Sequence, residues 1–164
     1  MSARKKPVPR VSKTKMPVTS PRRTAGVEPY LFFEGRCEEA IEFYRKTLAA
    51  DVAFLMRFKD SPEPPPPGSP PVDGNKVMHA TVRIGGTSLM MSDGHCGGRT
   101  SFNGFALSIR VSTSAEADRI FLALSAGGKV QVPLTKTFFS PRFGMVADRF
   151  GVLWMVIVMS EHQP

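Results

Sequence analysis

His79 is the side chain best suited to acid–base chemistry in this sequence. It stands near the start of VMHATVRI, whose alternation and β-branched residues predict a central strand. A histidine there could act as a general base or could donate a hydrogen bond to a ligand. However, no Asp or Glu lies at a spacing that would orient its ring. We therefore favour a structural or ligand-binding histidine, and His79 is only a weak candidate for catalysis.

A second candidate for chemistry is the adjacent pair His95 and Cys96, which lies in the glycine-rich stretch SDGHCGG. A thiol beside an imidazole could be a reactive thiol or a transient metal ligand. Neighbours in sequence need not face each other, and there is no second such pair, so we expect an incidental exposed thiol. The only other cysteine is Cys37, so a disulfide framework is not predicted. These observations favour a reduced, cytoplasmic protein.

A group of aromatic and methionine side chains lies near the predicted closing strands, and such side chains line small-molecule pockets as well as cores. The group is Phe138, Phe139, Phe143, Phe150 and Trp154, with Met90, Met91 and Met155. Phe139 and Arg142 flank the Ser140-Pro141 turn and are predicted to reach the mouth of a cavity. Asp148 is expected to fix the turn before Gly151 through bonds to the backbone rather than to act as an acid. The residues predicted to bind a ligand are His79, Met91, Phe139, Arg142 and Trp154, of which Trp154 is also a core candidate.

The formal net charge of +8 belongs to the N-terminal arm, residues 1–26. The arm holds eight Lys and Arg and no acid, whereas the remaining 138 residues hold 14 basic and 14 acidic side chains. Its four prolines and few large apolar residues predict disorder. If the arm does more than solubilise the chain, charge alone would attach it to nucleic acid or to an anionic surface. We favour the solubilising role.

The rest of the chain reads as one pattern used twice. A strand, a helix and three strands are predicted in residues 27–94 and again in residues 103–160, with a short tail at 161–164. The first helix has one continuous apolar face, and the second begins at a capping box, Thr113-x-x-Glu116. Seven prolines between Pro62 and Pro71 predict an exposed loop, and no run is long enough to span a membrane.

Several cofactor motifs are missing from the sequence. There is no phosphate-binding P-loop, no G-x-G-x-x-G, no nucleophile elbow and no C-x-x-C pair. The glycine-rich βαβ loop that would hold an adenosyl cofactor is missing as well. We therefore expect no cofactor.

Three segments carry a resemblance to a known family: PYLFFEGRCEEAIEFY, VMHATVRIGGTSLMMSD and RFGMVADRFGVLW. They resemble the PhnB-like proteins of the vicinal oxygen chelate superfamily, which includes glyoxalase I and the bleomycin- and fosfomycin-resistance proteins. The resemblance covers about residues 27–158. It implies an α+β fold in which two βαβββ modules form an eight-stranded, open, barrel-like sheet around a cavity. It also implies a homodimer.

Metal-dependent members of that superfamily hold a divalent ion on the first and last strands of each module. By resemblance, those positions fall at about Glu28 or Pro29, Met90, Ala106 and Met155. Methionine and alanine cannot hold a hard divalent ion, which needs oxygen or imidazole donors. No metal site is therefore expected.

Together these features predict a protein that binds a small apolar or mixed ligand in the sheet cavity. Two alternatives remain open. One is a glyoxalase-, lyase- or dioxygenase-like enzyme that uses His79. The other is an interaction module tethered through the basic arm at residues 1–26.

Overall fold

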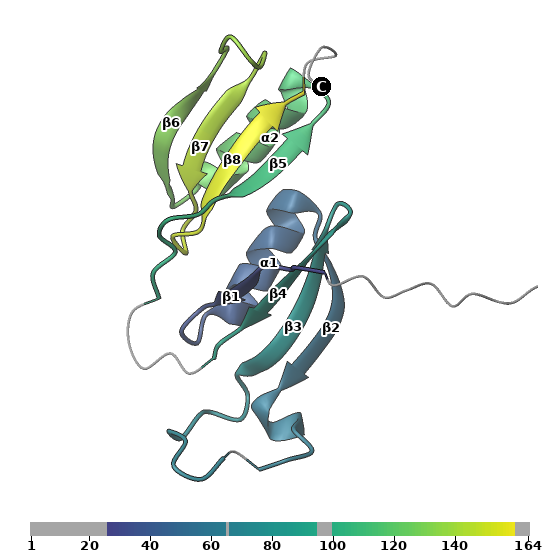
Figure 1. Ribbon diagram of the computed structural model, residues 1–164, viewed down its shortest axis with the longest axis vertical. Helices are drawn as coiled ribbons and strands as arrows, with labels where there is room; N and C mark the ends of the chain where they lie inside the picture. The colour runs from purple at the N-terminus through teal and green to yellow at the C-terminus, as the bar shows by residue number, and fades with distance from the viewer. Residues whose placement is uncertain (1–25, 65, 95–99, 160–164) are drawn as a thin grey trace, which may run out of the picture.

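The computed structural model describes residues 26–64, 66–94 and 100–159. Each half of the chain folds as a strand, a helix and three strands, as predicted (Figure 1). The first module contains β1 (Tyr30–Phe32), α1 (Cys37–Leu48), β2 (Asp51–Arg57), a short 3-10 helix (Phe58–Asp60), β3 (Val77–Ile84) and β4 (Thr87–Ser92). The second contains β5 (Leu107–Val111), α2 (Ser114–Ser125), β6 (Lys129–Thr135), β7 (Phe143–Ala147) and β8 (Leu153–Val158). Neither helix is long and apolar enough to cross a membrane, as judged over the described residues.

The eight strands form two four-stranded mixed sheets, in the orders β1-β4-β3-β2 and β5-β8-β7-β6. In each sheet the first strand of the module pairs in parallel with the last, and the other pairs are antiparallel. Within the described part of the chain, no strand pair joins the two sheets. One chain therefore divides the expected eight strands between two separate sheets.

Local sequence explains where both helices begin and end. In α1 the apolar face is buried, two glutamates occupy the first turn, and the helix ends at Ala49 in the left-handed conformation. In α2 the Thr113 side chain accepts a hydrogen bond from the Glu116 N–H, as the capping box predicts. The β3–β4 hairpin turns at Gly85-Gly86, where Gly85 has a positive φ of 58°.

A buried carboxylate, that of Asp148, joins the two modules. Its Oδ1 accepts the N–H groups of Phe150 (2.9 Å) and Val152 (3.1 Å), which confirms the predicted turn role. Its Oδ2 accepts the Tyr44 hydroxyl of α1 (2.7 Å) and the Trp154 indole N–H of β8 (2.8 Å). Burial, together with the nearby Asp148 charge, raises the pKa of Tyr44 well above its ordinary value. Tyr44 therefore remains a hydrogen-bond donor.

Two cation–π contacts cross the same interface in opposite directions. The Arg36 guanidinium of the first module lies 4.6 Å from the centre of the Phe150 ring in the second. The Arg149 guanidinium of the second module lies 4.6 Å from the centre of the Phe43 ring in the first. Such contacts stabilise a structure by about 0.5–1 kcal/mol each at exposed sites. The modules therefore meet through their helix-covered sides.

Replacing Tyr44 with Phe should destabilise the protein, because Asp148 then loses one donor in a site without water access. We expect the free energy of unfolding to fall by about 1–3 kcal/mol in urea titrations followed by circular dichroism. Tyr30→Phe is a matched control, because Tyr30 is partly exposed and water can replace its lost bond. Equal stability of Tyr44→Phe and the unaltered protein would show that the Asp148 link does not hold the modules together.

Candidate functional site

Each sheet has a face covered by a helix and an opposite, open face. In the first sheet, the register sets Tyr30 beside Met90, Met90 beside Thr81, and Thr81 beside Phe54. On β1, β3 and β4 the residues between these positions, such as Leu31, Ala80 and Met91, are buried on the side of α1. The open face therefore carries a cluster of aromatic, polar and methionine side chains: Tyr30, Phe32, Phe54, Met56, His79, Thr81 and Met90.

His79 lies at the centre of this cluster, and both nitrogens of its imidazole have a partner. The Tyr30 hydroxyl is 2.9 Å from Nδ1, and the Thr81 hydroxyl is 3.3 Å from Nε2. The rings of Tyr30 and Phe54 lie with their centroids 5.5 Å and 5.9 Å from that of His79, and Phe32 stacks on Tyr30 at 4.9 Å. Among the described residues, no carboxylate forms a hydrogen bond or an ion pair with this imidazole. Hydroxyl groups and aromatic rings therefore surround the imidazole.

The Tyr30 hydroxyl is protonated at neutral pH, because partial burial raises its pKa from an already high value. When it donates to Nδ1 of His79, the ring hydrogen must stand on Nε2. That N–H then points toward Thr81, on the open side of the sheet. A base would need a partner for its imidazolium form, which these hydroxyl groups supply poorly.

The second sheet has a comparable open face. Its register sets Met145 beside Met155 and Met155 beside Ser108, while Phe143 lies beside Ile157 and Ile157 beside Arg110. These side chains are exposed or half-buried, whereas the alternating residues of β7 and β8 pack under α2. This face is mainly apolar, with a guanidinium at one edge.

The residues at the superfamily's metal positions do not fit a divalent ion. Met90 and Met155 lie on the open faces, Ala106 precedes β5, and Glu28 is exposed. Across residues 26–64, 66–94 and 100–159, no three His, Cys, Asp or Glu side chains come together to hold an ion. A thioether and a methyl group cannot replace the oxygen and imidazole donors that such ions require.

The structure places two predicted ligand residues in the core. Met91 is fully buried on the helix side of β4, and its neighbour Met90 takes the open-face position, because one step along a strand changes the face. Met91 is therefore corrected to a core residue. Trp154, named both as core and as ligand residue, is buried and bonded to Asp148.

The other predicted residues lie on different modules. Phe139 packs edge-on against Phe143, and Arg142 pairs with Asp118 of α2 at 3.2 Å. No hydrogen bond, ion pair or ring contact among the described residues joins either of them to His79. His95, Cys96, residues 1–25 of the arm and the tail lie outside the described residues.

Sequence reasoning missed the aromatic partners of His79. Tyr30, Phe32 and Phe54 were not predicted as site residues, although two of them alternate in PYLFF and must share a face of that strand. This alternation was the available signal. The partnership of Phe54 with His79 depends on the pairing of β2 with β3, which no local pattern encodes.

Comparison with known proteins agrees with this geometry. The model of the 3-demethylubiquinone-9 3-methyltransferase family matches residues 25–157, which include both modules. The chain belongs to this PhnB-like family. Protein YjdN of Escherichia coli K12 is 37% identical over 142 residues, which are 82% of this chain and 96% of YjdN.

Solved structures show the same fold. Protein PA1353 of Pseudomonas aeruginosa is 40% identical with a TM-score of 0.73, over 83% of this chain and 98% of that one. A PhnB protein of Bacillus cereus, titled a putative 3-demethylubiquinone-9 3-methyltransferase, is 26% identical with a TM-score of 0.69, over 82% and 99%. A glyoxalase/bleomycin resistance/dioxygenase domain from Frankia is 17% identical with a TM-score of 0.57, over 85% and 96%, and supports the fold alone.

This PhnB-like protein should purify without a stoichiometric divalent ion, because its open faces offer thioethers and methyl groups where ligands would be needed. Elemental analysis after mild purification should find well under one equivalent of zinc, nickel, iron or manganese. A chelator should leave the melting temperature unchanged. A full equivalent of one such ion, lost together with stability on chelation, would contradict this expectation.

Proposed function

We propose that this PhnB-like protein binds a small apolar or mixed ligand, without a metal ion, on the open face of its first sheet around His79. The observation that carries the proposal is the Tyr30–His79 hydrogen bond inside a cluster of aromatic side chains. Phe32 and Phe54 are 47% and 46% exposed, which is unusual for side chains of this size grouped on one face. Exposed apolar groups of this kind mark binding surfaces.

The shape of the site favours a planar ligand that carries a polar group. Tyr30, Phe32 and Phe54 offer ring faces and edges for an aromatic or unsaturated body. His79 and Thr81 supply the few hydrogen bonds that orient a ligand in a mainly apolar pocket. Because His79 bonds to hydroxyl groups rather than to a carboxylate, binding is favoured over proton abstraction.

A second copy of the chain would close the site. The modules of one chain meet through their helix sides, at Tyr44 and Asp148, which leaves both open faces turned away from that contact. The open face of the second sheet is apolar and presents Val132, Met145 and Met155. In a two-fold dimer, the second sheet of each copy would cover the first sheet of the other, giving two equal cavities.

The strand-to-helix turns of this chain do not support a methyltransferase activity. An adenosyl cofactor needs a glycine-rich turn between a strand and a helix. Here the turn between β1 and α1 is residues 33–36, with one glycine, and the turn between β5 and α2 is residues 112–113, with none. The two strand-to-helix turns therefore offer no suitable cradle for that cofactor.

Removing side chains of the cluster around His79 should weaken ligand binding. A screen of aromatic diols, methylglyoxal–thiol adducts and antibiotics, read by thermal shift and native mass spectrometry, should identify a binder. For that compound, we expect Phe54→Ala and His79→Ala each to lower affinity about tenfold or more, as loss of a stacking or bonding group does. His79→Ala should cost about 1 kcal/mol of stability, because Tyr30 is partly hydrated.

Leu122→Ala is the matched control for this experiment, because Leu122 is an exposed side chain on α2. It should leave affinity unchanged. If the protein turns over a screened compound, and His79→Ala abolishes this turnover without changing the melting temperature, the protein is an enzyme rather than a binding protein. Equal affinities in all three variants would place the ligand elsewhere.

The intact chain should be a homodimer in sedimentation experiments at micromolar concentration. Val132→Lys on the open face of the second sheet should shift it toward the monomer, because a buried ammonium group is costly. Leu122→Lys, which adds the same charge on α2, should leave the dimer intact. A clean monomer of the unaltered protein would contradict the two-fold closure of the site.

A further inference from the structure

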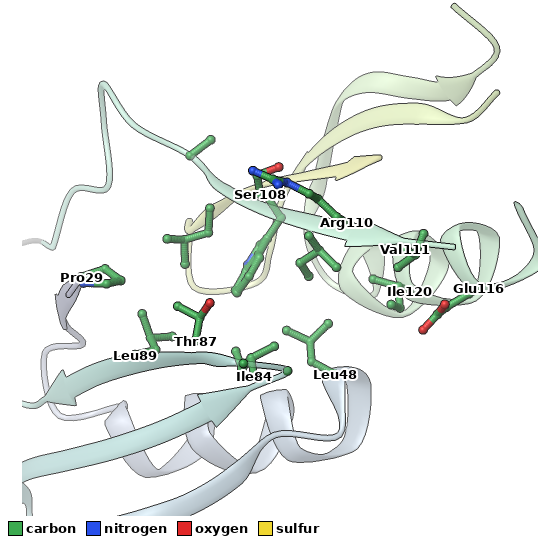
Figure 2. A pocket seen from close by; sticks show the side chains of 16 residues that line it. Pro29, Leu48, Ile84, Thr87, Leu89, Ser108, Arg110, Val111, Glu116 and Ile120 are labelled. Carbon is green, nitrogen blue, oxygen red and sulfur yellow. The ribbon is translucent and has the colours of Figure 1, made fainter. Parts of the chain in front are cut away.

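A cavity of about 660 Å³ lies between the two modules (Figure 2). The β3–β4 hairpin and the end of α1 form one wall, and β5 and the start of α2 form the other. The large apolar side chains in its walls include Leu48, Ile84, Leu89, Ile109, Ile120 and Trp154. A cavity of this size with mainly apolar walls matches small-molecule sites in general.

This cavity is separate from the face that carries His79. Leu89 lies on the helix side of β4, next to Met90 on the open side. In the second module the register pairs Leu107 with Trp154, which is buried on the helix side, while Ser108 pairs with Met155 on the open side. The pleat of the first sheet therefore stands between the cavity and the face that carries His79, whereas β5 contributes residues of both of its faces, Ser108 and Arg110 included, to the cavity wall.

A carboxylate stands at one end of the cavity. Glu116, in the first turn of α2, belongs to its wall and is exposed to solvent. The backbone N–H of Glu116 donates to the Thr113 hydroxyl, but no described residue pairs with the Glu116 carboxylate. The other charged residue at the wall is Arg110, whose guanidinium extends to the far side of β5 (Figure 2). Its register position beside Ile157 agrees with that direction.

We propose that the cavity binds a hydrophobic amine in its ammonium form. The aliphatic walls accept an alkyl or cycloalkyl body, and the ammonium group stands at the mouth beside Glu116. Apolar burial supplies the attraction, whereas the unpaired carboxylate selects the sign of the charge. The site is independent of the function proposed for the face around His79.

The chain contains its own probe for this site. Trp154 is the only tryptophan in the sequence, and it lines the cavity. Titration of the full-length protein with n-octylammonium at neutral pH, below its micelle concentration, should change tryptophan fluorescence in a saturable way. We expect octanoate to bind at least tenfold more weakly, because it would place its carboxylate beside Glu116.

Two variants separate charge selection from simple apolar burial. Glu116→Gln keeps the capping residue type but removes the charge, and should lower the affinity for n-octylammonium about tenfold while leaving that for 1-octanol unchanged. Glu63→Gln, which removes an exposed carboxylate in the proline-rich loop, should change neither affinity.

The proposal is overturned if no saturable change occurs, or if octylammonium, octanoate and octanol bind equally well. It is also overturned if Glu116→Gln binds octylammonium as the unaltered protein does. His79→Ala serves to distinguish the two sites. If it abolishes octylammonium binding, the amine lies on the open face instead. If it leaves this titration unchanged, the cavity stands whether or not a ligand is found for the face around His79.

Discussion

The four hydrogen bonds to the buried carboxylate of Asp148 are the interaction on which the arrangement of the two modules depends. Two of them shape the β7–β8 turn, one holds the Trp154 ring, and one reaches across to Tyr44. A carboxylate is tolerated in such a place only when donors surround it. Two cation–π pairs also cross this interface, but the hydrogen bonds to this carboxylate are directional and set the orientation of the contact. It fixes the helix sides together and leaves the two open faces for other partners.

A second buried carboxylate does similar work inside the first module. Asp93 accepts the N–H of Cys37 at the start of α1 (2.8 Å) and the N–H of Val77 at the start of β3 (2.9 Å). Burial, followed by the Asp93 charge, raises the pKa of the Cys37 thiol. That thiol is therefore protonated and inert. Both buried aspartates serve the fold, so neither is available as an acid or a nucleophile.

The two proposed binding places differ in their chemistry. On the open face of the first sheet, imidazole, hydroxyl and aromatic groups are suited to hold a ligand and poorly suited to activate one. In the cavity between the modules, aliphatic walls meet one carboxylate. The thioethers at the superfamily's metal positions agree with the same conclusion, since soft sulfur does not hold a hard ion. The function proposed for this PhnB-like chain is recognition of a ligand by shape and hydrogen bonding.

The amino-acid sequence by itself determined the features that depend on local pattern. Helix faces repeat every three or four residues, the Thr113 cap acts within one turn, and Asp148 bonds to N–H groups two and four residues away. Only the tertiary structure decided the sites. Tyr30 and His79 are 49 residues apart, and Tyr44 and Asp148 are 104 apart, so strand register and module docking bring them together. The same dependence explains the error at Met91. Alternation shows that neighbours point to opposite faces, but only the packed helix shows which face is the core.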